Sequence, residues 1–260
     1  MSFERVIDRC FNRRPRMRRW ITRLLEGDRD LTVRLLSADV RINSIKEHGY
    51  LRASRLSRFN SLLRDELPVL QSLSYLLGGA DAFVDVGANV GVYCAVLAKL
   101  RRLNPVPFYA FEANPDTYRR LVETTAGLAV ETFNLAVSDR EGTLDFVPGA
   151  VSHVFTTVDR VSGYSLPAPP VRIACRRLDA FPLRGSRMIV KIDVEGQEMN
   201  VVRGMGAFLE QGRVFACYVD GYGERGLPGL LREHGFRLLD GRTLEARPDG
   251  DCHALLALRD

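Results

Sequence analysis

Residues 83–91 constrain this chain more than any other stretch, with the sequence FVDVGANVG. An apolar strand leads into a turn that contains two glycines, and a helical pattern follows directly. This order is typical of nucleotide-binding α/β folds, in which the turn lets a ligand approach the backbone. A second apolar run, Phe108–Phe111, ends in Glu112, where a carboxylate can accept both hydroxyls of a ribose. The pattern therefore predicts a nucleotide-type site together with a fold.

Strands alternate with helices from residue 82 to the end of the chain. The expected strands are 82–86, 107–111, 130–136, 188–193, 215–219, 235–239 and 252–258, and the expected helices lie near 90–102, 115–126, 196–210 and 224–234. Such alternation predicts a mostly parallel sheet with helices on both faces.

One segment departs from the alternation. Thr143–Val147 and Val171–Cys175 have the pattern of extra strands on either side of a loop that contains Gly and Pro. A loop of this length inside a compact domain is either disordered or functional. We therefore expect an insertion near 143–175 that contributes a wall of the site.

The first 78 residues form a separate pattern. Leu31–Ile42 predicts a small hairpin, and the leucine spacing in Phe59–Leu77 predicts an amphipathic helix that ends at Gly78. The chain is accordingly divided into an N-terminal helical and hairpin extension, 1–78, and an α/β domain, 79–260.

The net charge of +5 comes from the N-terminal segment, because residues 1–60 hold fifteen Lys or Arg against seven Asp or Glu. A basic helix packed on the domain explains this balance, and contact with an anionic membrane surface is left open. Nucleic acid is not an expected partner, because aromatic residues do not alternate with the arginines. Neither a secretory signal nor a membrane span is visible, and the five cysteines are scattered, so the expected location is cytoplasmic.

The turn after the first strand distinguishes between classes of ligand. A dinucleotide fingerprint requires glycine at position 89 and a small residue at 92, whereas this chain has Asn89 and Val92. Gly87 and Gly91 still allow the turn backbone conformations that other residues disfavour. The N-terminus of the helix that follows favours the binding of an anionic group. The loop suits S-adenosylmethionine, whose ammonium group needs an acceptor that Asp85 and the loop backbone can supply.

The exit of the third strand lies on the same edge of the sheet. Its backbone near Ala136, with Asn134 or Asp139, is expected to face the adenine ring by topology.

The fourth strand carries the candidate catalytic acids. Alternation places Lys191, Asp193 and Glu195 on one face, with the two acids at the open end of the sheet. These acids can orient an acceptor hydroxyl, take its proton or balance a sulfonium charge. His153 in the insertion is an alternative proton acceptor. A divalent cation shared with Asp220 is left open, but no metal is predicted.

Together these segments resemble the FkbM family of S-adenosylmethionine-dependent methyltransferases. The resemblance covers roughly residues 80–240 and rests on five ordered blocks: Phe83–Gly91, Phe111–Pro115, Asn134–Gly142, Arg177–Asp179 and Lys191–Glu198. It implies the class I methyltransferase fold (Rossmann-like), a seven-stranded sheet with an antiparallel last strand, and O-methylation of a sugar, glycan or polyketide hydroxyl.

The resemblance also assigns residues to roles. Asp85, Gly87, Asn89, Gly91 and Glu112 correspond to the cofactor motifs, and Asp193 and Glu195 to the acids of the fourth strand. One departure lies at Tyr218–Asp220, where relatives often carry a Glu-x-His-like strand end.

We therefore predict an S-adenosylmethionine-dependent methyltransferase that acts on a small-molecule or glycan acceptor. Two alternatives remain, a cofactor-binding scaffold without catalysis and an NAD-dependent oxidoreductase, of which Asn89 and Val92 disfavour the second. The oligomeric state is not indicated.

Overall fold

A seven-stranded mixed sheet forms the centre of the protein. The computed structural model describes residues 15–55, 61–149, 151–152, 155–158, 169–221, 226–247, 249 and 252–259. The strands, in their order across the sheet, are β12 (Arg237–Asp240), β13 (Ala254–Leu258), β11 (Val214–Asp220), β10 (Met188–Ile192), β3 (Ala82–Val86), β4 (Phe108–Phe111) and β5 (Val130–Phe133). Strand β13 runs opposite to the other six strands of this sheet. This order and the reversed last strand confirm the expected class I methyltransferase fold.

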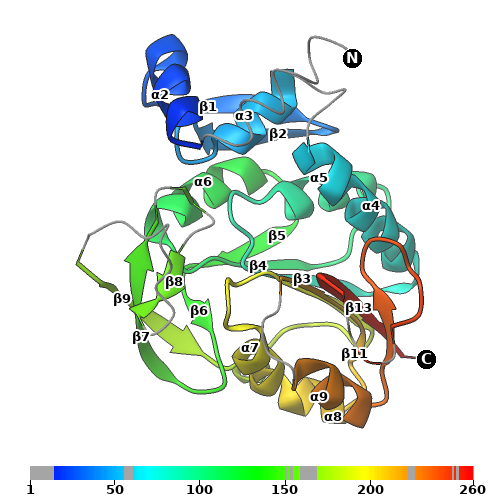
Figure 1. Ribbon diagram of the computed structural model, residues 1–260. Helices are drawn as coiled ribbons and strands as arrows, with labels where there is room; N and C mark the ends of the chain where they lie inside the picture. Colours follow the sequence, from blue (N-terminus) through cyan, green and yellow to red (C-terminus); the bar gives the residue numbers. More distant parts are fainter. Residues whose placement is uncertain are drawn as a thin grey trace.

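Helices cover both faces of this sheet (Figure 1). One face carries α4 (Ser61–Leu76), α5 (Val92–Leu100) and α6 (Pro115–Thr125), and the other carries α7 (Glu198–Gly204), α8 (Gly206–Glu210) and α9 (Leu227–Glu233). The central strands are buried throughout because both of their faces are covered. No helix among the described residues is long and apolar enough to cross a membrane.

The N-terminal segment adds a layer outside α5 and α6. It contains α2 (Pro15–Glu26), the hairpin of β1 (Asp30–Leu35) and β2 (Ala38–Asn43), and α3 (His48–Arg55). The hairpin is confirmed, and its apolar residues join the same core as α5 and α6. A buried ion pair between Glu47 and Arg120 of α6, 2.9 Å apart, fastens this layer to the domain.

The insertion forms a second, four-stranded sheet. Its strands are β6 (Ala136–Val137), β9 (Val171–Arg176), β7 (Gly142–Pro148) and β8 (Phe155–Thr157), in that order. Both extra strands are therefore confirmed. The single strand expected over 130–136 is wrong, because β5 ends at Phe133 and the chain then leaves the main sheet to pair Ala136 with Cys175.

The helix expected over 196–210 is also divided. Helix α7 ends at Gly204 and α8 begins at Gly206. A Cβ atom at Gly204 would lie 2.0 Å from the carbonyl oxygen of Ser138. This close approach requires glycine and lets α7 pack against the loop that follows β6.

Candidate active site

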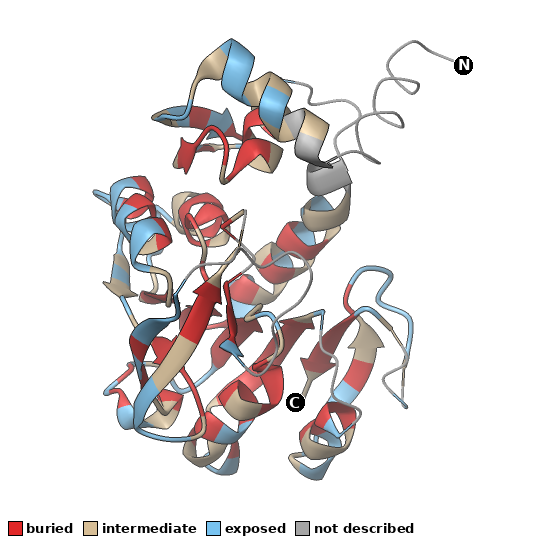
Figure 2. Cartoon of the chain, turned by 60° about the vertical axis from the view of Figure 1, so that its left-hand side comes forward, coloured by how far each residue is buried: buried red, intermediate tan, exposed pale blue. Residues whose placement is uncertain are grey.

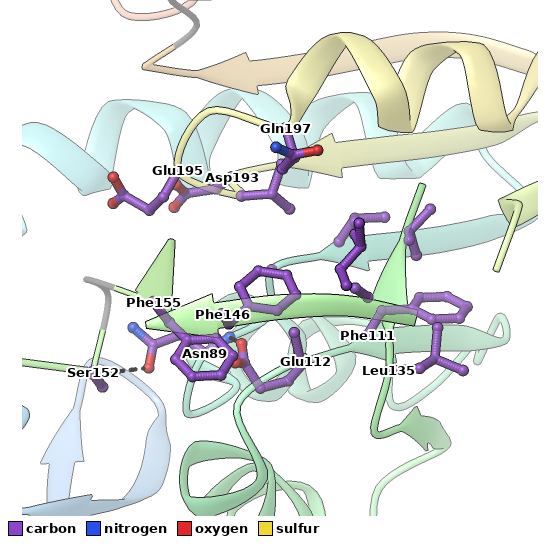
Figure 3. A pocket seen from close by; sticks show the side chains of 17 residues that line it. Asn89, Phe111, Glu112, Leu135, Phe146, Ser152, Phe155, Asp193, Glu195 and Gln197 are labelled. Atoms are coloured by element: carbon purple, nitrogen blue, oxygen red, sulfur yellow. Dashed lines mark hydrogen bonds between the residues drawn. The ribbon is translucent and has the colours of Figure 1, made fainter. Parts of the chain in front are cut away.

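A pocket opens where the carboxyl ends of β3, β4 and β10 face the second sheet (Figure 3). It encloses about 670 Å³, open solvent at its mouth included. Its walls are Val86, Gly87, Asn89, Phe111, Glu112, Ala113, Leu135, Ala136, Val137, Leu144, Phe146, Ser152, Phe155, Asp193, Val194, Glu195 and Gln197. Small-molecule sites combine apolar walls with a few convergent polar groups. This lining has both kinds of residue.

The glycine turn brings β3 and β10 together at the pocket floor. Gly87 has a φ of 80°, and a Cβ atom there would lie 1.8 Å from the carbonyl oxygen of Asp193. Only glycine combines this backbone conformation with so close a contact. Gly91 has a φ of 83° but faces Leu121 of α6. Gly91 therefore shapes the start of α5 and does not line the pocket, and its contact with the ligand stays a prediction.

Asn89 occupies the centre of the turn with a φ of 51°, a conformation that asparagine tolerates better than most residues. Its side-chain oxygen accepts a hydrogen bond from the Ser152 hydroxyl at 3.2 Å. The turn is thus joined to the insertion across one side of the pocket, as Figure 3 shows.

Glu112 lies at the end of β4, with its carboxylate in the pocket wall. One carboxylate oxygen accepts the N–H of Asn89 at 2.9 Å, and the other accepts the N–H of Asn114 at 2.8 Å. Burial raises the pKa of Glu112 to about 7, although the two backbone N–H groups act in the opposite direction. Each oxygen keeps a second lone pair, so the carboxylate can accept two further hydrogen bonds.

Asp85 has a different place from the one expected. Its carboxylate is fully buried below the turn, outside the pocket lining, and Nζ of Lys191 lies 3.1 Å from it. Burial raises the pKa of Asp85, and the charge of Lys191 opposes that shift. In this structure Lys191 is the cation beside the Asp85 carboxylate, and the contact of Asp85 with a ligand ammonium group stays a prediction.

Lys191 links two acids of neighbouring strands. Its Nζ lies 3.7 Å from the carboxylate of Asp193 and 4.8 Å from the centre of the Tyr93 ring. Lys191 is therefore held between Asp85 below and Asp193 at the pocket. The expected placement of Lys191 and Asp193 on one face of β10 agrees with this contact.

The acids after β10 form the wall opposite Glu112 (Figure 3). Asp193 is partly exposed to the pocket, and Glu195, with a φ of 51°, lies at the mouth. Partial desolvation raises the pKa of Glu195 to about 7, and the charges of Asp193 and Glu198 add to the effect. Gln197 completes this wall and is held by Thr157 of β8 through a 3.1 Å hydrogen bond.

Of the three residues expected near adenine, only Ala136 lines the pocket, whereas Asn134 and Asp139 do not. Ala136 lines the pocket, as does its neighbour Leu135. The amide of Asn134 instead donates to the carbonyl of Glu112 at 2.9 Å, and Asp139 lies outside the pocket lining beside Ser138. Neither Asn134 nor Asp139 thus reaches the pocket. His153 lies outside the described residues.

Two aromatic residues of the site, Phe146 and Phe155, were not predicted from the sequence. The rings of Phe146 and Phe155 stack with centroids 4.8 Å apart and close the pocket from the second sheet. The alternation of Leu144 and Phe146 within an expected strand was a signal that these two side chains share one face. Ser152 and Gln197 carried no comparable signal.

The described residues contain no group of three His, Cys, Asp or Glu side chains arranged to hold a metal ion. Asp220, considered above as a shared ligand, lies 3.7 Å from His253 and 4.0 Å from Arg242.

Glu66 of α4 is expected to make the free energy of unfolding depend on pH. Burial raises the pKa of Glu66 to about 8, and Lys191 opposes the shift. Because the pKa of Glu66 is higher in the folded than in the unfolded protein, its protonation stabilises the fold. This contribution is fully present below the unfolded pKa of 4.5 and is lost as the pH rises through 8. Glu66→Gln mimics the protonated form. We expect its free energy of unfolding, from urea titrations between pH 5 and 8, to decline less with pH than that of the unmodified protein.

Glu233→Gln on the exposed side of α9 is the control and should keep the original slope. Equal slopes for Glu66→Gln and the unmodified protein would contradict the assignment.

The chain is similar in sequence to known methyltransferases. The profile described as Methyltransferase FkbM domain matches residues 85–238. The hexuronic acid methyltransferase AglP of Haloferax volcanii is 28% identical over an alignment of 160 residues, and the match covers 55% of this chain and 57% of AglP. The chain thus spans little more than half the length of this curated relative.

Similar solved structures include methyltransferase FkbM from Methylobacillus flagellatus KT, at 13% identity and a TM-score of 0.46, over 75% of this chain and 59% of that one. An O-methyltransferase family protein from Burkholderia thailandensis has 11% identity and a TM-score of 0.44, over 95% and 70% respectively. Because the profile alone covers more than half of the sequence, the chain belongs to the FkbM methyltransferase family.

Proposed function

We propose that this protein transfers a methyl group from S-adenosylmethionine to a hydroxyl group of a sugar-like small molecule or glycan. The observation that carries the proposal is the carboxylate of Glu112, held by two backbone N–H groups between an apolar and an acidic part of one pocket. When bound, S-adenosylmethionine supplies an activated methyl group on a sulfonium centre. Family membership and the pocket chemistry support the same activity.

Residues along the pocket lining would hold the different parts of S-adenosylmethionine. Phe111, Leu135 and Ala136 offer an apolar surface for a flat heterocycle, and Glu112 offers acceptors for two ribose hydroxyls. Asn89 and the backbone at Gly87 lie at the polar end, where the amino-acid portion would be held.

Asp193 is the candidate general base. It lies in the wall opposite Glu112, at the end of the strand next to the glycine turn. There it would accept a hydrogen bond from the acceptor hydroxyl and take up its proton, which makes the oxygen a better nucleophile. Lys191, 3.7 Å away, would keep this carboxylate oriented. Glu195 at the mouth is the alternate.

Two observations support a sugar-like acceptor: the carboxylates in the pocket wall and the similarity to AglP. Carboxylates accept hydrogen bonds without donating any, so Asp193 and Glu195 suit a molecule with several hydroxyl groups. AglP is named as a hexuronic acid methyltransferase, a sugar-modifying enzyme. A cytoplasmic location is part of the proposal, supported by the thiols of Cys94, Cys175 and Cys217, which form no disulfide.

Glu112→Gln tests the cofactor site. The amide NH₂ of glutamine must face the N–H of either Asn89 or Asn114, so one backbone donor loses its acceptor and the ribose loses a charged one. We expect the Kd for S-adenosylmethionine to rise about 10- to 100-fold in calorimetry, the effect of one charged hydrogen bond. Binding by the unmodified protein should tighten from pH 6 to 8, because the pKa of Glu112 is about 7.

Glu131→Gln, an exposed change on β5, is the matched control and should bind as the unmodified protein does. An unchanged affinity in Glu112→Gln would reject this site as the one that holds S-adenosylmethionine.

A further inference from the structure

Helix α2 presents large apolar side chains to solvent. Trp20, Leu24 and Leu25 are 64%, 70% and 74% exposed. None of them belongs to the cores of the described residues or packs against those cores. Figure 2 shows the helix at the outer edge of the N-terminal layer, with exposed residues along it. A helix that merely packs on its domain buries its apolar side chains, whereas this one exposes them.

The same helix is strongly basic. Its sequence PRMRRWITRLLE holds four arginines and a single acid, Glu26. The surrounding segment 1–60 carries more than twice as many basic as acidic residues. Arginines beside exposed Trp and Leu are the composition of helices that lie in the headgroup region of a membrane.

We propose that α2 binds the surface of an anionic lipid bilayer. Trp20, Leu24 and Leu25 enter the boundary between headgroups and acyl chains, and Arg19 and Arg23 contact the lipid phosphates. The helix lies in the plane of the surface, because its twelve residues are too few to cross the hydrocarbon core.

Charge and area favour a lipid surface over a second copy of the chain. Pairing α2 with its own copy would bring two net-positive helices together, whereas anionic phosphates neutralise them. Three exposed side chains also offer far less than the roughly 1,200 Å² that a stable protein interface buries. The inference is independent of the proposed methyl transfer.

Trp20 is the only tryptophan in the chain, so tryptophan fluorescence, excited selectively over the tyrosines, reports on α2 alone. The full chain is titrated with vesicles of phosphatidylcholine and with vesicles that also contain phosphatidylglycerol. We expect a shift of the emission to shorter wavelength, and co-sedimentation, with the anionic vesicles only. The double variant Leu24→Ser/Leu25→Ser should bind them at least roughly tenfold more weakly, because it loses two buried leucines.

The control is Leu103→Ser, which changes a fully exposed leucine outside α2 and should leave vesicle binding intact. Equal binding to both vesicle types, or none, would overturn the proposal. An emission maximum already at short wavelength before vesicles are added would do the same, since Trp20 would then be shielded from solvent in the free protein.

Discussion

Replacing Lys191 with methionine is expected to lower the free energy of unfolding by about 3–5 kcal/mol, because it leaves a buried charge without its partner. The carboxylate of Asp85 is fully buried, and Nζ of Lys191 is the cation beside it, 3.1 Å away. Methionine fills a similar volume, so lost packing contributes little to the expected change. Urea unfolding followed by circular dichroism measures it.

The double variant Asp85→Asn/Lys191→Met separates the buried charge from other causes. It removes both members of the pair, so we expect it to recover most of the stability that Lys191→Met loses. Arg176→Met, which breaks an exposed ion pair with Glu141, should cost less than about 1 kcal/mol. A double variant less stable than Lys191→Met would contradict the account.

Replacing Asp193 with asparagine is expected to reduce kcat about 10²- to 10⁴-fold, the usual contribution of a general base. Asparagine keeps the shape of the side chain and can still accept a hydrogen bond, but it cannot take a proton. Methyl transfer to a panel of monosaccharides and hexuronic acids, followed with radiolabelled S-adenosylmethionine, gives the rate. The affinity for S-adenosylmethionine, measured separately, distinguishes loss of the base from loss of binding.

Asp145→Asn on β7 is the matched control, because this partly exposed aspartate pairs with Arg172 and does not line the pocket. It should retain the original kcat. If Asp193→Asn is also unchanged, Glu195→Gln becomes the next variant to measure, and Asp193 is rejected as the base.

The sequence predicted elements whose patterns are local. The apolar runs of β3, β4 and β10 end as expected, at the glycine turn, at Glu112 and at the acids. Glu112, Asn89 and Asp193 therefore meet in one pocket. The sequence did not determine features that depend on a distant partner. The place of Asp85 depends on Lys191, which is more than 100 residues away, and the end of β5 depends on the pairing of Ala136 with Cys175.

The order of strands, the glycine turn and the acid after the second strand were readable from the sequence, because periodicity and turn chemistry act over a few neighbouring residues. Only the tertiary structure decided that Phe146 and Phe155 close the pocket, that Gly91 packs on α6 and that Trp20 faces solvent. The reason is physical. Which side chain is buried, and which carboxylate meets a cation, depends on surfaces that come together only when the whole chain has folded.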